Sequence, residues 1–299
     1  MSALGPVLII GCGDVGLRLA RQLLASGRPV SALARSAERA QELREAGLQV
    51  VEGDLDAGDH PIEGLPSAGA TVYYLAPPPG GGTVDTRLRV FLGSIEPGNE
   101  PAKVIYMSTT GVYGDCGGAL IDETAEAKPT TARGQRRLDA ENLLRQWGNL
   151  RKVAVVVLRV AGIYGPGKLP LNRLQEGQPV IDDPEAPQTN RIHVDDLVQV
   201  CLAAEEKGED GDLFNVCDDE GGTMSAYFDA VADAFSLPRP ARIPMDQARQ
   251  ILSPLMISYF SESRRLDNRR MHERLRVSLR YPRLAEGLAA LVAETKENG

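Results

Sequence analysis

The chain has 299 residues, 42% of them hydrophobic and 25% charged, which is enough for a sizeable buried core. Its formal net charge of −8 argues against a nucleic-acid partner, because nonspecific binding to a phosphate backbone depends on clustered Lys and Arg. No apolar stretch approaches the roughly 20 residues that a membrane span needs, and no basic segment precedes an apolar signal core. The four cysteines have no metal-type CxxC spacing, so we expect free thiols and no metal site. These features favour a cytoplasmic protein with a small-molecule partner.

Short apolar runs alternate with amphipathic segments through the first half of the chain. Residues 6–10 (PVLII) predict a buried strand, residues 14–27 an amphipathic helix, and residues 29–34 the next strand. The same pattern predicts further elements in this order: helix 37–46, strand 48–54, strand 70–76, helix 84–95, strand 103–109, helix 132–147 and strand 154–159. This alternation predicts an α/β fold, a Rossmann-type doubly wound parallel sheet of six or seven strands with helices on both faces.

The composition of the sequence changes after about residue 165. Pro and Gly recur over residues 166–187 and interrupt any long element. We therefore expect one domain over residues 1–165 and a smaller, mainly separate C-terminal lobe over residues 166–299, with some later segments returning to the first domain.

A glycine motif stands where the first strand meets the first helix. "GCGDVG" places Gly11, Gly13 and Gly16 in a GxGxxG spacing, with Asp14 and Val15 between the last two. The first Gly permits a tight turn, the second lets the backbone approach a pyrophosphate, and the third lets helix and strand pack closely. The motif predicts a dinucleotide site at these five residues. The alternative is a tight strand–helix turn without a ligand.

The residues after the second strand bear on which dinucleotide binds. An acid there would bind the ribose 2′-hydroxyl of NAD, but the chain has Arg35 and Ser36, followed by Arg39. A guanidinium beside a hydroxyl suits the 2′-phosphate of NADP, so we expect NADP, with NAD possible. The alternative is a solvated arginine at a helix start. After the third strand come Asp54 and Leu55, where the Asp54 carboxylate could accept from the adenine amino group or form a turn.

Five later motifs appear in order. They are "MSTTGVYGD" (107–115), the helix that opens at 132, "LRVAGIYGPG" (158–167), "RIHVDDL" (191–197) and "FNVCDD" (214–219). With the glycine motif they resemble the extended short-chain dehydrogenase/reductase superfamily, the NAD(P)-dependent epimerase/dehydratase proteins, over nearly the whole chain. GxGxxG in place of TGxxGxxG and "YLAPPPGGG" at 74–82 resemble an atypical branch. The resemblance implies that the C-terminal lobe binds substrate and that Ala76, Arg137 and Gly162 lie beside the cofactor.

The resemblance also implies an active site, and this chain departs from it. The family uses a Ser or Thr after a strand and a Tyr-x-x-x-Lys on the next helix, whose Tyr exchanges a proton while hydride moves between substrate and cofactor. Alignment on "VYG" places Thr109 at the hydroxyl position. Alignment on Glu141 places Arg137 at the Lys position and Arg133 at the Tyr position. A guanidinium keeps its proton near neutral pH, so neither arginine is a general base.

The arginines of this helix have other possible roles. Residues 133 and 137 share one helix face, so both can point at the same cleft. Arg137 could still bind the nicotinamide ribose, while Arg133 and Arg136 could hold an anionic substrate. The alternative is a solvated basic face balanced by Asp139 and Glu141.

A surviving reaction needs another proton source. Tyr113 and Tyr164 are candidates, because their motifs border the cleft in the family, and Thr109 could relay a proton through water. The alternative for either tyrosine is a packed ring whose hydroxyl is tied to the backbone.

The substrate side also departs from the familiar pattern. Gly162 stands where extended members commonly carry Asn, and the Arg of "NRIHVDDL" stands two residues before His193 instead of four, which puts nucleotide-sugar recognition in doubt. His193 and Asp195 fit a loop organiser and helix cap better than catalysts. The basic cluster at 264–270 fits a solvated helix face.

Two functions of different classes follow. The first is an NAD(P)-dependent oxidoreductase or epimerase-like enzyme with an altered proton relay, acting on a small carbonyl or hydroxyl substrate, either anionic or sugar-derived. The second is a catalytically silent dinucleotide-binding sensor or partner-binding protein, favoured by the joint loss of Tyr and Lys. The resemblance also implies a possible homodimer formed through the helix at 132–147.

Overall fold

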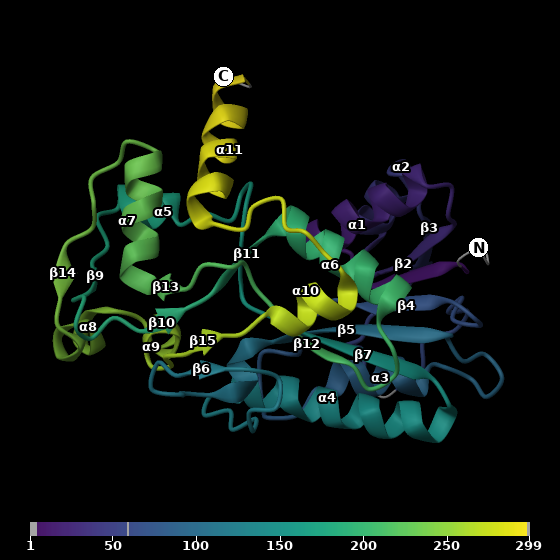
Figure 1. The fold of residues 1–299 in the computed structure, drawn as a ribbon. Helices are drawn as coiled ribbons and strands as arrows, with labels where there is room; N and C mark the ends of the chain where they lie inside the picture. Colours follow the sequence, from purple (N-terminus) through teal and green to yellow (C-terminus); the bar gives the residue numbers. More distant parts are fainter. Residues whose placement is uncertain (1–4, 59, 298–299) are drawn as a thin grey trace.

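The computed structural model describes residues 5–58 and 60–297. Its centre is a seven-stranded parallel sheet with the strand order β12-β7-β5-β4-β1-β2-β3 (Figure 1). The strands are β1 (Val7–Ile10), β2 (Val30–Ala34), β3 (Gln49–Glu52), β4 (Thr71–Tyr74), β5 (Lys103–Thr109), β7 (Ala154–Val160) and β12 (Leu213–Val216). The predicted doubly wound α/β fold is confirmed, and the seventh strand is supplied by the "FNV" segment of a late motif.

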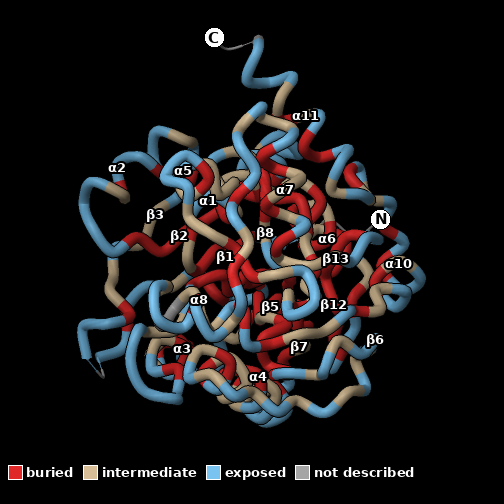
Figure 2. Tube along the Cα trace, turned by 90° about the vertical axis from the view of Figure 1, so that its left-hand side faces the viewer, coloured by how far each residue is buried: buried red, intermediate tan, exposed pale blue. Residues whose placement is uncertain are grey.

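Helices cover both faces of this sheet. In Figure 1, α1 (Asp14–Ala25), α2 (Ala37–Glu45) and α6 (Val194–Lys207) lie above it, and α3 (Thr86–Gly93) and α4 (Ala132–Arg151) lie below. Alternate residues of each strand point to opposite faces. Val7 and Ile9 of β1 therefore pack with the upper helices, whereas Leu8 and Ile10 pack with the lower ones. The buried strands form the red centre of Figure 2.

Side-chain caps begin several of the helices that surround the site. Ser36 accepts from the N–H of Arg39 at the start of α2, and Asp85 accepts from Leu88 at the start of α3. Thr131 accepts from the N–H of Gly134 and so begins α4. A short oxygen-bearing side chain at this position pairs an N–H that the helix leaves free. The local sequence thus fixes where each of these helices starts.

The chain after residue 165 builds a smaller lobe and also returns to the large sheet. The lobe, at the left and top of Figure 1, contains α5 (Leu171–Gln175), α7 (Met224–Ala234), α8 (Met245–Ile251), α9 (Pro254–Phe260) and α11 (Leu284–Glu297). Between these elements, α6 and β12 join the large sheet, and α10 (Arg269–Leu275) packs against both.

The structure also contains short two-stranded ladders outside the large sheet. They pair β8 (Gly162–Tyr164) with β11 (Arg191–His193), β9 (Val180–Ile181) with β14 (Arg242–Ile243), β10 (Gln188–Thr189) with β13 (Gly222–Thr223), and β6 (Leu120–Ile121) with β15 (Arg265–Leu266). A 3₁₀ turn, η1 (Thr110–Tyr113), follows β5. In the described part of the chain, no helix is both long and apolar enough to cross a membrane.

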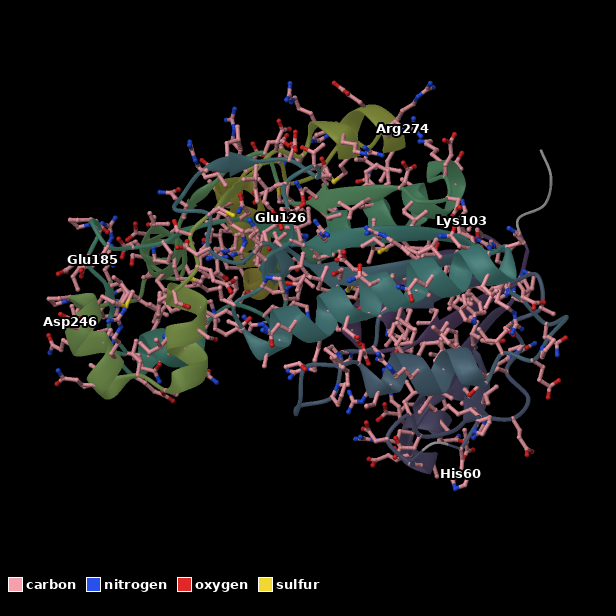
Figure 3. All side chains as sticks on the ribbon, turned by 90° about the horizontal axis from the view of Figure 1, so that it is seen from below. His60, Lys103, Glu126, Glu185, Asp246 and Arg274 are labelled. Carbon is pink, nitrogen blue, oxygen red and sulfur yellow. The ribbon has the colours of Figure 1, made fainter. Side chains whose placement is uncertain are left out.

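The sheet has a switch point between β1 and β4. The chain leaves β1 toward β2 on one side, and β4 pairs with β1 on the other. Ligands of open parallel sheets bind outside the carboxyl ends of the strands at such a point. These ends face the smaller lobe, because Lys103 at the start of β5 lies at the opposite end of the molecule from Glu185 and Asp246 (Figure 3).

Candidate functional site

The glycine turn after β1 has the shape that a bound pyrophosphate requires. Gly11 has a φ of 87°, and a Cβ on it would lie 2.4 Å from the backbone nitrogen of Ala76. A Cβ on Gly16 would lie 3.2 Å from the carbonyl oxygen of Gly11, so helix and strand are in close contact there. A Cβ on Gly13 would meet no atom within 4 Å, so the backbone of the turn is open on that side. The three glycines therefore fit a dinucleotide, each for a different reason.

The two residues between the glycines have different environments. Val15 packs against the core of the upper face. Asp14 is exposed, and its carboxylate forms ion pairs of 3.1 Å with Arg18 and with Lys168 of the C-terminal half. The Asp14 carboxylate is therefore already paired with two cations beside the turn.

A cavity of about 310 Å³ continues from the glycine turn over the ends of β2 and β3. Its lining includes Gly11, Arg35, Asp54, Leu55, Ala76 and Arg87. The Arg35 side chain is 69% exposed, and its guanidinium lies 3.6 Å from the Asp56 carboxylate. Arg87 of α3 pairs with the same carboxylate and donates to the carbonyl of Pro77. Sequence analysis missed Arg87, because no motif marks its position on α3.

Three polar residues near this cavity also have structural partners. Ser36 caps α2, so its hydroxyl already accepts one hydrogen bond. Arg39 donates to the carbonyl of Cys12 at 2.6 Å and thereby braces the glycine turn. Asp54 lines the cavity and accepts from the N–H of Asp56 at 2.9 Å, which is a turn contact. Of the predicted cofactor contacts past β2, Arg35 has the most accessible side-chain charge.

A second cavity, of about 490 Å³, lies near the first, since Ala76 lines the first and the next residue, Pro77, lines the second. It lies between the ends of β4 and β5, the start of α4 and the smaller lobe. Its polar lining includes Thr109, Glu262 and five arginines, which are Arg133, Arg136, Arg137, Arg191 and Arg264. Five guanidinium groups against one carboxylate make this cavity strongly cationic, and we call it the arginine cavity.

The three arginines of α4 do not form a solvated face. Arg137 donates to the carbonyl of Met107 at 2.8 Å, and Arg136 is buried and donates to the carbonyl of Gly82 at 2.6 Å. The Arg133 guanidinium lies 4.3 Å from the ring centre of Tyr259 on α9. The alternative of a basic face balanced by neighbouring acids is therefore wrong.

The two acids of that alternative have other partners. Asp139 accepts from Arg89 of α3. Glu141 is fully buried and accepts hydrogen bonds from Ser108 and from Arg159 of β7, whose guanidinium lies 4.5 Å from the ring centre of Tyr113. Glu141 therefore anchors α4 to the sheet from the inside.

Thr109, the residue predicted at the hydroxyl position, lines the arginine cavity. It ends β5, and its Oγ1 accepts from the N–H of Gly111 at 3.2 Å. Residues of both tyrosine motifs line this cavity, as Gly111 and Ile163 do, but Tyr113 and Tyr164 themselves are buried and do not. The Tyr113 hydroxyl donates to Asn215 at 2.7 Å, and burial raises its pKa. The Tyr164 hydroxyl packs toward α11, where a Cβ on Gly287 would lie 2.3 Å from it.

Gly162 leaves room for an arginine of the smaller lobe. A Cβ on Gly162 would lie 2.8 Å from Nη1 of Arg191, so the arginine occupies the space of the missing side chain. The Arg191 guanidinium also lies 3.9 Å from the ring centre of Tyr227. Arg191, the arginine of the "NRIHVDDL" motif, therefore lines the arginine cavity.

Most of the remaining motif residues cap or pair within the fold, and one of them lines the cavity. His193 accepts from the N–H of Asp195 and caps α6, and the Asp195 carboxylate pairs with Arg18. In the basic cluster at 264–270, Arg264 lines the cavity, donates to the carbonyl of Gly114 and pairs with Glu262. Its helical part pairs with acids outside the cavity instead, as Arg270 does with the buried Asp212. Only the first arginine of that cluster belongs to the site.

Comparison with known proteins agrees with this geometry. Residues 92–217, which include β5, α4 and β7, match the model described as the NAD dependent epimerase/dehydratase family. The chain belongs to this family. Residues 7–59, which hold the glycine turn, also match the model of the TrkA-N domain.

Similar proteins extend over most of the chain. Protein YeeZ of Escherichia coli (strain K12) is 25% identical over 240 residues, which cover 78% of this chain and 85% of YeeZ. A functionally unknown conserved protein of Silicibacter pomeroyi has a structure with 32% identity and a TM-score of 0.82, covering 98% of this chain and 99% of that one. The UDP-glucuronic acid 4-epimerase of Bacillus cereus, solved with UDP-glucuronic acid and NAD, has 19% identity and a TM-score of 0.74, with 98% and 100% coverage.

Proposed function

We propose that the protein is an NAD(P)-dependent oxidoreductase or epimerase-like enzyme that prefers NADP and acts on a small anionic substrate with a carbonyl or hydroxyl group. The observation that carries this proposal is the cavity that brings Thr109 together with five arginines, beside the cavity that borders the glycine turn. An anion in it would meet several fixed guanidinium groups at once, which favours its binding over that of a neutral molecule.

The residues around the glycine turn suit the dinucleotide. Gly13 leaves the pyrophosphate side of the turn open, and the start of α1 offers its free N–H groups to an anion. Arg35 would bind the 2′-phosphate of NADP, and its ion pair with Asp56 would loosen as the phosphate arrives. Arg87 keeps that carboxylate paired, which leaves Arg35 free to move.

The bound dinucleotide would supply or accept a hydride, and the chain's own groups would do the rest. Thr109 would hydrogen-bond the substrate oxygen and pass its proton to or from water in the cavity. Arg133 and Arg264 would hold the anionic part of the substrate. Arg137 would keep the end of β5 and the start of α4 in register, since it bonds to backbone there.

The second candidate is a catalytically silent dinucleotide-binding sensor. It is favoured by Arg133 and Arg137, which stand where the family has Tyr and Lys and offer no acid or base there; Arg137 instead donates to a backbone carbonyl. In that case the cavity would bind an anion without converting it.

Dinucleotide binding is the first test. NADPH and NADH are titrated into the protein by fluorescence, and the titration is repeated with Arg35→Asp and with Arg44→Asp, which changes an exposed arginine paired with Glu52. We expect NADPH to bind more tightly than NADH, and we expect only Arg35→Asp to remove this preference. Equal binding of both nucleotides by the original protein would overturn the NADP assignment, and binding of neither would overturn both candidates.

Turnover separates the two candidates. The protein with NADPH is offered a panel of oxo acids, sugar acids and nucleotide sugars, and NADPH oxidation is followed. Oxidation that depends on Thr109, tested with Thr109→Val, supports the enzyme. Tight NADPH binding with no turnover of any anionic substrate supports the sensor.

A further inference from the structure

A third cavity, of about 620 Å³, lies in the smaller lobe between α7, α11 and residues 218–223. Its walls are mostly small apolar side chains, among them Ala230 of α7 and Leu288 and Val292 of α11. Small side chains on two facing helices leave space that larger ones would fill. The volume is in the range of small-molecule sites, which are mostly apolar with a few placed polar groups.

Asp218 is one of the charged residues that line this cavity, together with Arg191 and Glu220. The residue is only 4% exposed, and within the described parts of the chain neither carboxylate oxygen has a hydrogen-bond partner of good geometry. Its own N–H donates to the carbonyl of Arg191 at 2.6 Å, which fixes the backbone. Buried carboxyl groups without a partner are rare because the loss of solvation is not compensated. The position therefore suits a ligand that brings a donor.

The nearest guanidinium does not satisfy Asp218. Arg191 is engaged by the ring of Tyr227, the carbonyl of Asn190 and the sulfur of Met224. Burial raises the pKa of Asp218 to about 8, although the Glu220 N–H and the charge of Arg191 act in the opposite direction. Glu220 also lines the cavity and adds a negative charge, and a bound ammonium group would favour the ionised form of Asp218.

We propose that this cavity binds a small molecule with an apolar body and a primary ammonium group, whose N–H groups donate to Asp218 while the body lies between α7 and α11. This site is separate from the proposed active site and does not depend on its function. Thr189 and Arg191 line both cavities, so the ligand would lie directly behind the arginine cavity.

The test uses three probes with the same aromatic body and different heads. 2-Phenylethylamine, 2-phenylethanol and 3-phenylpropionate are titrated into the full-length protein by calorimetry. We expect the amine to bind at least about tenfold more tightly than the alcohol, and the carboxylate not to bind. Equal binding of all three, or no binding of the amine, would overturn the proposal.

Variants locate the site. Asp218→Asn should lower amine affinity at least about tenfold, because the amide oxygen can accept a hydrogen bond but carries no negative charge to pair with the ammonium group. Asp246→Asn is the matched control, since Asp246 is exposed on α8 (Figure 3) and does not line the cavity. Ala230→Phe would fill the cavity and leave the Asp218 carboxyl intact, and it should also abolish amine binding. Retained affinity in Asp218→Asn or in Ala230→Phe would overturn the assignment.

Discussion

The guanidinium of Arg137 donates to the carbonyl oxygen of Met107 at 2.8 Å, and it also approaches the hydroxyl of Tyr106 at 3.3 Å. Arg137 stands where the family's lysine is expected, and it connects the first turns of α4 with the end of β5. An arginine can hold several acceptors at once because its N–H groups form a planar fork. The start of α4 is thereby fixed beside Thr109.

Arg137→Met should leave these acceptors without a donor and lower the free energy of unfolding by about 1–3 kcal/mol. Arg137→Lys should lose less, since an ammonium group can keep one of the bonds. Urea unfolding measures both. Arg21→Met on the surface of α1 is the control, and an equal loss there would show that the α4–β5 contact contributes nothing.

Two glycines of the turn should respond differently to alanine. In Gly11→Ala the new Cβ would clash with Ala76 at a positive φ, so both folding stability and NADPH binding should fall. In Gly13→Ala the Cβ meets open space, so stability should persist while the methyl group blocks the pyrophosphate and NADPH affinity drops at least about tenfold. Thermal unfolding and NADPH titration separate the two effects. Undiminished NADPH binding by Gly13→Ala would contradict a pyrophosphate at this turn.

Arg133 should contribute to anion binding without supporting the fold. It stacks on the exposed Tyr259 and lines the arginine cavity. With NADP present to fill the dinucleotide site, Arg133→Ala should weaken the binding of citrate about tenfold, measured by calorimetry, and change stability by less than about 0.5 kcal/mol. Arg21→Ala on α1 is the surface control. Citrate binding that is indifferent to Arg133 would argue against an anionic substrate.

The ion pair of Glu141 and Arg159 is shielded from solvent, with the carboxylate fully buried. Glu141→Gln should lower the free energy of unfolding by about 3–5 kcal/mol, because Arg159 is left as an unpaired buried charge. Glu126→Gln breaks an exposed pair with Lys128 and should cost less than about 1 kcal/mol. Chemical unfolding compares the two, and similar small losses would show that Arg159 finds another partner.

Glu205 should make stability depend on pH. Burial alone would raise the pKa of its carboxyl, but hydrogen bonds from Arg28, Thr71 and Tyr73 outweigh this effect and hold the pKa below its usual range. The unfolded chain therefore binds a proton more readily, so this contribution is complete above the unfolded pKa and is lost as pH falls through the folded one. In urea unfolding from about pH 7 to about pH 3, Glu205→Gln should lose less stability on acidification than the original protein does. An unchanged pH profile would contradict this.

The sequence by itself determined the fold and the dinucleotide site to a large extent. The alternation of buried strands and amphipathic helices is a local pattern, and so is the glycine spacing at residues 11, 13 and 16, so neither needs knowledge of distant contacts. The replacement of the expected Tyr and Lys by Arg133 and Arg137 was also visible along one helix.

Only the tertiary structure decided which polar groups share the site. Tyr113 looked available from its motif, but its hydroxyl meets Asn215, a hundred residues on in the chain, inside the protein. Arg191 and Arg264 come from separate segments of the smaller lobe and join Thr109 only because the loops after the strands fold together. The unpartnered carboxyl of Asp218 could not be inferred either, because burial and the lack of a donor depend on every element around it. Periodicity fixes which face of an element is buried, whereas the partner of a buried charge depends on contacts between distant segments.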